Sequence, residues 1–113
     1  MSQDTPFEVS EIRRDEQSVS LQVNGDLTVD TSPQLKEILN VCFDQKLKQI
    51  HIVLDGVARM DSSGIATLVA GLRWSRSSGN HFVISGLSEA VHDLFVIAKL
   101  DSEFEVLTEG SSQ

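Results

Sequence analysis

The stretch IHIVLDGVARMDSSGIATLVAGL, residues 50–72, joins two different hydrophobic patterns. Its first five residues are a short apolar run rich in β-branched side chains, which predicts a central strand covered on both faces. From Ile65 onward, apolar residues recur at the three-and-four spacing of an amphipathic helix. The polar tetrapeptide DSSG (residues 61–64) separates the two patterns and is therefore expected at the N-terminus of a helix.

Before this stretch, the sequence predicts two strands and one helix. Apolar residues alternate roughly over residues 7–12 and cleanly over 19–23, and the three residues 15–17 between them are short enough for an antiparallel hairpin. The tripeptide TSP (residues 31–33) is a helix start signal, because a hydroxyl can cap free N–H groups and proline at the first helical position loses no bond. The next apolar residues share one helix face, which includes Cys42, so this thiol is expected to be a packed hydrophobe.

After this stretch, the same alternation continues. The residues SSGN (77–80) tolerate left-handed geometry and are expected to end the helix. A strand is predicted over 82–84, then a helix after Ser88 with Glu89 in its first turn, and then a last short strand near 104–107.

Length and composition limit the chain to one domain. Its 113 residues are fewer than the roughly 150 of a typical domain, and the 40% of hydrophobic residues suffice for one core. We expect a single α/β domain over residues 5–108, with helices packed on a mixed, mostly parallel sheet in the order ββαβαβαβ. Residues 109–113 are polar and are expected to form a flexible tail.

Charge and cysteine content exclude several classes of function. Nine basic residues against 17 acidic ones give a net charge of −8, which disfavours nucleic acid and anionic membranes as partners. The single cysteine forms no internal disulfide, and no metal-ligand spacing or GxxxxGK[ST] loop predicts a metal or a nucleotide cofactor. No signal-peptide pattern and no membrane-length apolar run is present, so we expect a cytoplasmic protein.

The DSSG tetrapeptide has two interpretations. Aspartate or serine at a helix N-cap is common and contributes on the order of 1 kcal/mol, but a cap accounts for only one of the three polar residues. Alternatively, a serine hydroxyl projects at the helix N-terminus, where free backbone N–H groups and the positive end of the helix dipole would accept a phosphate. Residue types alone leave both interpretations open.

The heptapeptide RMDSSGI (residues 59–65), between a predicted strand and an amphipathic helix, resembles the signature of STAS domains, specifically of bacterial anti-sigma factor antagonists. Gly25-Asp26-Leu27 resembles the glycine-x-leucine turn of that family, and the segment 86–95 resembles its later strand-to-helix segment. The resemblance covers about residues 7–107.

This resemblance implies a small α/β domain that is the substrate of an enzyme rather than an enzyme. The phosphoacceptor of the family maps to Ser62. An unphosphorylated antagonist binds an anti-sigma factor that is also a serine kinase, and thereby releases the sigma factor. Phosphorylation by this kinase ends the interaction, and a PP2C-type phosphatase reverses it. The about −1.5 to −2 charges added beside Asp61 would repel the partner surface.

The partner-binding surface is expected to include a set of residues around the motif, namely Asp26, Asp61, Ser62, Ser63 and Gly64. Trp74 is a further candidate, because it lies between two arginines, and tryptophan and arginine are enriched at interface hot spots. Partial packing on the sheet edge is the alternative interpretation of Trp74.

Two other functions compete with this one. An enzyme would use Ser62 as nucleophile with His51, His81 or His92 as base, but the required elbow has glycine where this chain has Met60, so no enzyme is predicted. Within the STAS superfamily, the chain could instead be the accessory subunit of an ABC-type lipid transporter or a stressosome scaffold protein.

Overall fold

Strands and helices alternate along the chain as the hydrophobic pattern predicts. The structure, a computed structural model, describes residues 6–100 and 102–107. Its elements are β1 (Glu8–Arg14), β2 (Ser18–Asn24), α1 (Ser32–Phe43), β3 (Gln49–Gly56), α2 (Ser62–Ser78), β4 (His81–Ser85), α3 (Glu89–Ile97) and β5 (Glu105–Leu107). The predicted α/β class and the order ββαβαβαβ are confirmed. The predicted flexible tail, residues 109–113, lies outside the described residues.

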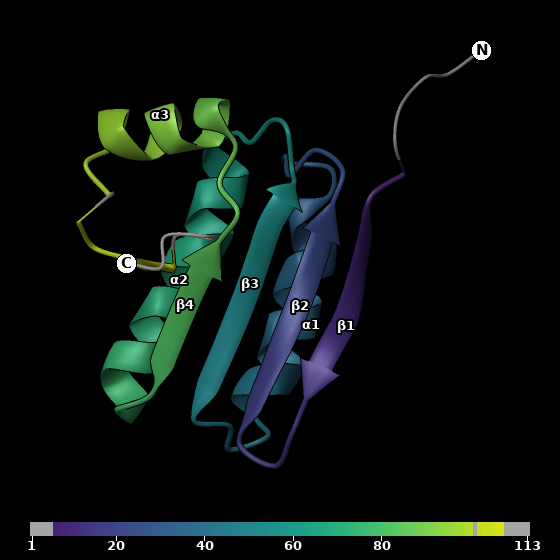
Figure 1. Cartoon of the computed structure of the whole chain (residues 1–113), viewed down its shortest axis with the longest axis vertical. Helices are drawn as coiled ribbons and strands as arrows, with labels where there is room; N and C mark the ends of the chain where they lie inside the picture. The colour runs from purple at the N-terminus through teal and green to yellow at the C-terminus, as the bar shows by residue number, and fades with distance from the viewer. Residues whose placement is uncertain (1–5, 101, 108–113) are drawn as a thin grey trace.

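The five strands form one mixed sheet in the order β1-β2-β3-β4-β5 (Figure 1). β1 pairs antiparallel with β2, whereas the other three strand pairs are parallel. The predicted N-terminal hairpin and the central place of β3 are therefore both confirmed. The β1–β2 ladder contains a bulge between Glu11 and Arg13.

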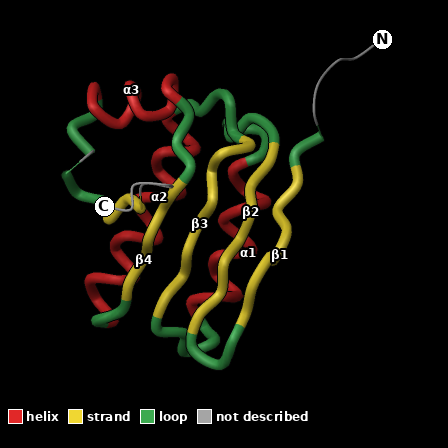
Figure 2. Tube along the Cα trace, viewed as in Figure 1, coloured by secondary structure: helices red, strands yellow, loops and turns green. Residues whose placement is uncertain are grey.

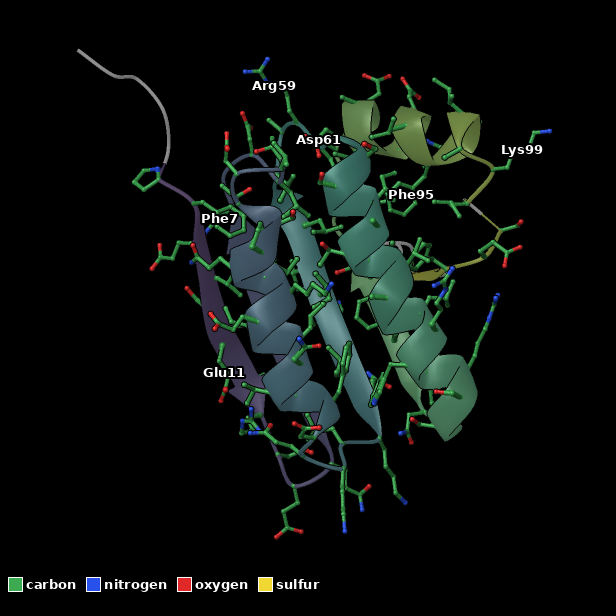
Figure 3. The ribbon with its side chains drawn as sticks, turned by 180° about the vertical axis from the view of Figure 1, so that it is seen from behind. Phe7, Glu11, Arg59, Asp61, Phe95 and Lys99 are labelled. Carbon is green, nitrogen blue, oxygen red and sulfur yellow. The ribbon has the colours of Figure 1, made fainter. Side chains whose placement is uncertain are left out.

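Both long helices lie on the same face of the sheet, as the reverse view shows (Figure 3). Burial along β3 consequently alternates: Ile50, Ile52 and Leu54 are 0% exposed, whereas His51 and Val53 are only partly buried. The prediction that this strand is covered on both faces is wrong. Because β2, β3 and β4 follow one another across the sheet in one direction, right-handed crossovers place α1 and α2 on the same side.

The core fills the space between this helical layer and the sheet. Gly71 of α2 permits the close approach of helix and sheet, since a Cβ atom there would lie 2.4 Å from ring atoms of Phe82. Cys42 is 3% exposed within the core, which confirms it as a packed hydrophobe, and burial raises the pKa of its thiol. The largest fully buried side chains are Phe95, Leu27, Leu35, Leu39, Ile50, Ile52, Leu54, Leu68 and Ile84.

The start of α1 differs from the prediction. The helix begins at Ser32, so Pro33 is its second residue, and the Thr31 hydroxyl makes no capping bond to the helix. Instead, Thr31 Oγ1 accepts a hydrogen bond from the Thr28 backbone N–H at 2.9 Å and donates to the Asp26 carbonyl at 2.7 Å. The loop before α1 uses this hydroxyl because its own backbone groups need partners.

The carboxyl ends of β2, β3 and β4 lie at one end of the sheet. The loops that leave them begin α1, α2 and α3, and α3 itself lies across this end (Figure 2). Ser88 caps α3 by accepting a hydrogen bond from the Val91 N–H at 3.2 Å. No helix in residues 6–100 and 102–107 has both the length and the apolar character needed to cross a membrane.

Candidate functional site

Asp61 is the N-cap of α2, and both oxygens of its carboxylate accept backbone hydrogen bonds. Its Oδ1 atom accepts hydrogen bonds from the backbone N–H groups of Ser63 at 2.9 Å and Gly64 at 3.2 Å. Its Oδ2 atom accepts one from the Val29 N–H at 3.0 Å. The capping interpretation of the DSSG tetrapeptide therefore applies to Asp61, which also connects α2 to the loop before α1.

The two serines that follow have different environments. Ser62 is the first residue of α2 and is exposed, whereas Ser63 is partly buried. Gly64 is buried, and a Cβ atom at this position would lie 2.6 Å from Met60 Cγ and 2.7 Å from the Leu27 carbonyl oxygen. The glycine thus lets α2 start directly against the neighbouring loop, and Ser62 is the residue of the tetrapeptide that this arrangement leaves at the surface.

Two hydrogen-bonded loops lie next to the start of α2 and together form what we call the platform: residues 25–31 and residues 57–61. Leu27 donates its backbone N–H to the Arg59 carbonyl at 3.0 Å, and Asp61 donates its own to the Leu27 carbonyl at 3.1 Å. A parallel bridge between Leu27 and Met60 completes the connection. The parallel register of β2 and β3 brings the loops together, so sequence patterns alone do not reveal these bonds.

An ion pair lies on the exposed side of the platform. Arg59 Nε is 3.5 Å from Asp26 Oδ2, and the two side chains are 81% and 44% exposed. Val29, whose backbone N–H bonds Asp61, is 63% exposed. Arg59 projects from the same end of the molecule as Asp61 (Figure 3). Sequence analysis identified Asp26 but not Arg59 or Val29. A basic residue three positions before Ser62 in an acidic chain was the available signal for Arg59.

Trp74 lies apart from this group. It is twelve positions after Ser62 on α2, which corresponds to about 18 Å along the helix axis. Its indole ring stacks on Phe43 of α1 with ring centroids 5.1 Å apart, and its side chain is partly buried. The structure therefore places it in the contact between α1 and α2, far from Asp26 and Asp61.

The first turn of α2 has fewer free backbone donors than the phosphate interpretation of the tetrapeptide requires. The backbone N–H groups of Ser63 and Gly64 are both bonded to the Asp61 carboxylate. The Ile65 N–H is also used, in the first helical bond to the Asp61 carbonyl at 3.1 Å. A cap that satisfies the first turn of a helix necessarily removes donors that an anion would otherwise use.

The histidines considered for catalysis lie elsewhere. His51 points to the sheet face opposite α1 and α2, with Nδ1 3.4 Å from Ser20 Oγ and Nε2 2.7 Å from Ser85 Oγ. Both ring nitrogens thus contact serines other than Ser62. His81 begins β4, and His92 is exposed on α3. Within the described residues, no three histidine, cysteine or acidic side chains form a group that could hold a metal ion.

Comparison with known sequences agrees with the fold and the motif. A family model described as "Mlab, STAS domain" matches residues 10–109. The anti-sigma-B factor antagonist of Staphylococcus epidermidis is 32% identical over 80 residues, which cover 71% of this chain and 74% of that protein. The protein of the same name from Staphylococcus aureus (strain NCTC 8325 / PS 47) is 31% identical over 80 residues, which again cover 71% of this chain and 74% of that protein.

Solved structures show the same fold at lower identity. The anti-sigma factor antagonist SpoIIAA in its unphosphorylated form superposes with a TM-score of 0.75 at 18% identity, over 92% of this chain and 90% of that one. An anti-sigma factor antagonist from Mycobacterium paratuberculosis superposes with a TM-score of 0.75 at 17% identity. The superposition covers 91% of this chain and 88% of that one. These relatives are named as antagonists of a regulatory protein and not for a catalytic activity. The chain therefore belongs to the STAS domain family, with anti-sigma factor antagonists among its sequence relatives.

Proposed function

We propose that this protein is an anti-sigma factor antagonist controlled by phosphorylation of Ser62. In its unmodified form it binds an anti-sigma factor that is also a serine kinase, and the bound kinase no longer holds the sigma factor. The kinase then transfers the γ-phosphoryl group of ATP to Ser62 Oγ, which loses its proton while ADP leaves. A PP2C-type phosphatase hydrolyses the phosphoserine and restores the active form.

The observation that carries this proposal is the exposed Ser62 at the start of a capped helix, beside two hydrogen-bonded loops. A kinase must bring its phosphoryl donor to within bonding distance of the acceptor, which favours a hydroxyl that is both accessible and held in a fixed position. Asp61 fixes the start of α2, and Gly64 allows the helix to begin directly on the platform. Proteins with this fold support the assignment, since SpoIIAA has been solved in a phosphorylated form, with a TM-score of 0.69 at 17% identity.

We assign the docking surface to Ser62 and to five residues of the platform and of the start of α2, namely Asp26, Val29, Arg59, Asp61 and Ser63. It combines an exposed apolar side chain, Val29, with an exposed ion pair, which suits a small interface with an apolar centre and a charged rim. Gly64 lies beneath this surface, and Trp74 lies outside it. A phosphate on Ser62 would add about −1.5 to −2 charges next to two aspartates and would weaken a contact made there.

Affinity purification from the native cells tests this function. We expect to recover an ATP-binding serine kinase with the chain, and to find by peptide mass analysis a fraction of Ser62 heavier by about 80 Da, one phosphoryl group. A Ser62→Ala chain should recover the same kinase without the modified form. Ser78→Ala, at an exposed serine at the other end of α2 and outside the docking surface, serves as the matched control that remains modified at Ser62.

The same experiment separates the competing functions. Recovery of a permease and its ATPase with an unmodified chain would contradict the proposal and favour the accessory subunit of an ABC-type lipid transporter. Recovery of a large assembly of STAS proteins without kinase-dependent modification at Ser62 would instead favour a stressosome scaffold.

A further inference from the structure

Arg59 and Asp26 form an ion pair that the fold does not require. The contact involves a single nitrogen at 3.5 Å, and the arginine side chain is 81% exposed. Exposed pairs of this kind contribute little to stability, because water competes for both charges. The guanidinium group can therefore leave Asp26 at little cost to the fold.

The backbone on both sides of this pair is held in place. The Arg59 carbonyl accepts the Leu27 N–H at 3.0 Å, and the Gly56 carbonyl accepts the Gly25 N–H at 2.9 Å. Only the side chain of Arg59 is thus left to move. It starts three residues before Ser62, on the loop that leads directly into α2.

A phosphate on Ser62 would have few partners on the backbone. The N–H groups of Ser63, Gly64 and Ile65 are already bonded to Asp61. The platform loops carry three carboxylates, Asp26, Asp30 and Asp61, and Arg59 is their one cation. A dianion placed in this acidic setting needs a positive partner, and a guanidinium group can pair with two phosphate oxygens at once.

We propose that Arg59 is the internal counter-charge of phosphorylated Ser62. On phosphorylation its guanidinium group leaves Asp26 and binds the phosphate, so the Asp26 carboxylate becomes unpaired on the docking surface. The modification then changes three charged groups of this surface rather than one. This inference rests on the proposed function, because it takes Ser62 as the modified residue.

The test uses a chain that carries phosphoserine at position 62, incorporated during synthesis so that no kinase is needed. The readout is the second pKa of the phosphate, near about 6 for a free phosphoserine, followed by phosphorus NMR during a pH titration at low salt. A bound guanidinium stabilises the dianion and lowers this pKa. We expect the phosphate of the Arg59→Gln variant to bind its proton about threefold more tightly than that of the otherwise unchanged chain.

Arg73→Gln is the matched control, since Arg73 is exposed on α2 about 17 Å along the helix from Ser62 and its replacement removes the same charge. It should leave the phosphate pKa unchanged. Equal pKa values in the Arg59→Gln and Arg73→Gln chains would overturn the inference. Because the phosphate is installed without a kinase, this result does not depend on the proposed function, whose failure would appear as an unmodified Ser62 in cells.

Discussion

The docking surface and the sheet face opposite α1 and α2 both contain serine side chains, but these serines differ in their hydrogen bonding and exposure. On the opposite face, Ser20 and Ser85 lie within hydrogen-bond range of the two ring nitrogens of His51, at 3.4 and 2.7 Å. At the docking surface, Asp61 satisfies the backbone of α2 and leaves the Ser62 side chain exposed. The comparison teaches that a serine at a helix start stays exposed where a neighbour, here an aspartate, caps the backbone in its place.

The largest expected effect comes from removing the Ser62 hydroxyl. Ser62→Ala should abolish labelling by the recovered kinase with radioactive ATP, because the substitution removes the hydroxyl that accepts the phosphoryl group. It should leave kinase binding intact, because it adds neither charge nor bulk to the docking surface. Ser62→Asp should weaken binding by about tenfold, since a permanent charge partly imitates the phosphate. Wild-type labelling of the Ser62→Ala chain would show that the acceptor lies elsewhere.

Substitution of Gly64 should disrupt the packing of α2 against the platform. A Cβ atom there would lie 2.6 Å from Met60 Cγ and 2.7 Å from the Leu27 carbonyl, so α2 and the platform must move apart. We expect Gly64→Ala to lower the free energy of unfolding by about 1–3 kcal/mol in urea titrations. Ala66→Ser, at an exposed position of the same helix, is the control and should cost under about 0.7 kcal/mol. Equal stability of both variants would contradict the close packing of Gly64.

Loss of the Asp61 carboxylate should have a smaller effect on stability. Asp61→Ala removes the cap of α2 and the bond to the Val29 N–H, and we expect a loss of about 1–2 kcal/mol by urea denaturation. Asp61→Asn keeps an oxygen acceptor and should retain part of this stability. Asp30→Ala, which removes an exposed carboxylate of the same platform, should be close to neutral. If Asp61→Ala left the free energy of unfolding unchanged, the cap would contribute nothing to stability.

The smallest effect concerns the opposite face and depends on pH. Burial lowers the pKa of His51 below the usual 6.5, so in the unfolded chain this histidine binds its proton at higher pH than in the folded chain. Its contribution to stability is therefore complete above pH 6.5 and is lost as the pH falls through the lower pKa of the folded state. Urea titrations between pH 7.5 and 5.5 should show this decline, and His51→Gln should reduce it.

His92→Gln is the control for this decline, because His92 is exposed on α3. The stability of this variant should depend on pH in the same way as that of the unsubstituted chain. If His51→Gln and His92→Gln gave the same pH dependence, the lowered pKa of His51 would have no effect on stability.

Much of the fold followed from local patterns. The spacing of apolar residues indicated each strand and helix in order, because periods of two and of 3.6 residues bury different sets of side chains. The DSSG tetrapeptide also indicated a helix start, and the cap is Asp61, one of the residues considered for it. The errors lie where a residue has a partner from another element. Thr31, for instance, bonds the preceding loop instead of capping α1.

The sequence by itself determined the element order, the packed state of Cys42 and the position of Ser62 at a helix N-terminus, since each depends on residues close together in the chain. Only the tertiary structure decided which face of β3 is covered, which N–H groups Asp61 occupies and which charge faces Arg59. Those properties depend on the parallel register of β2 and β3, which brings Asp26 and Val29 beside Arg59 and Asp61. No local pattern encodes a contact between residues more than 30 positions apart.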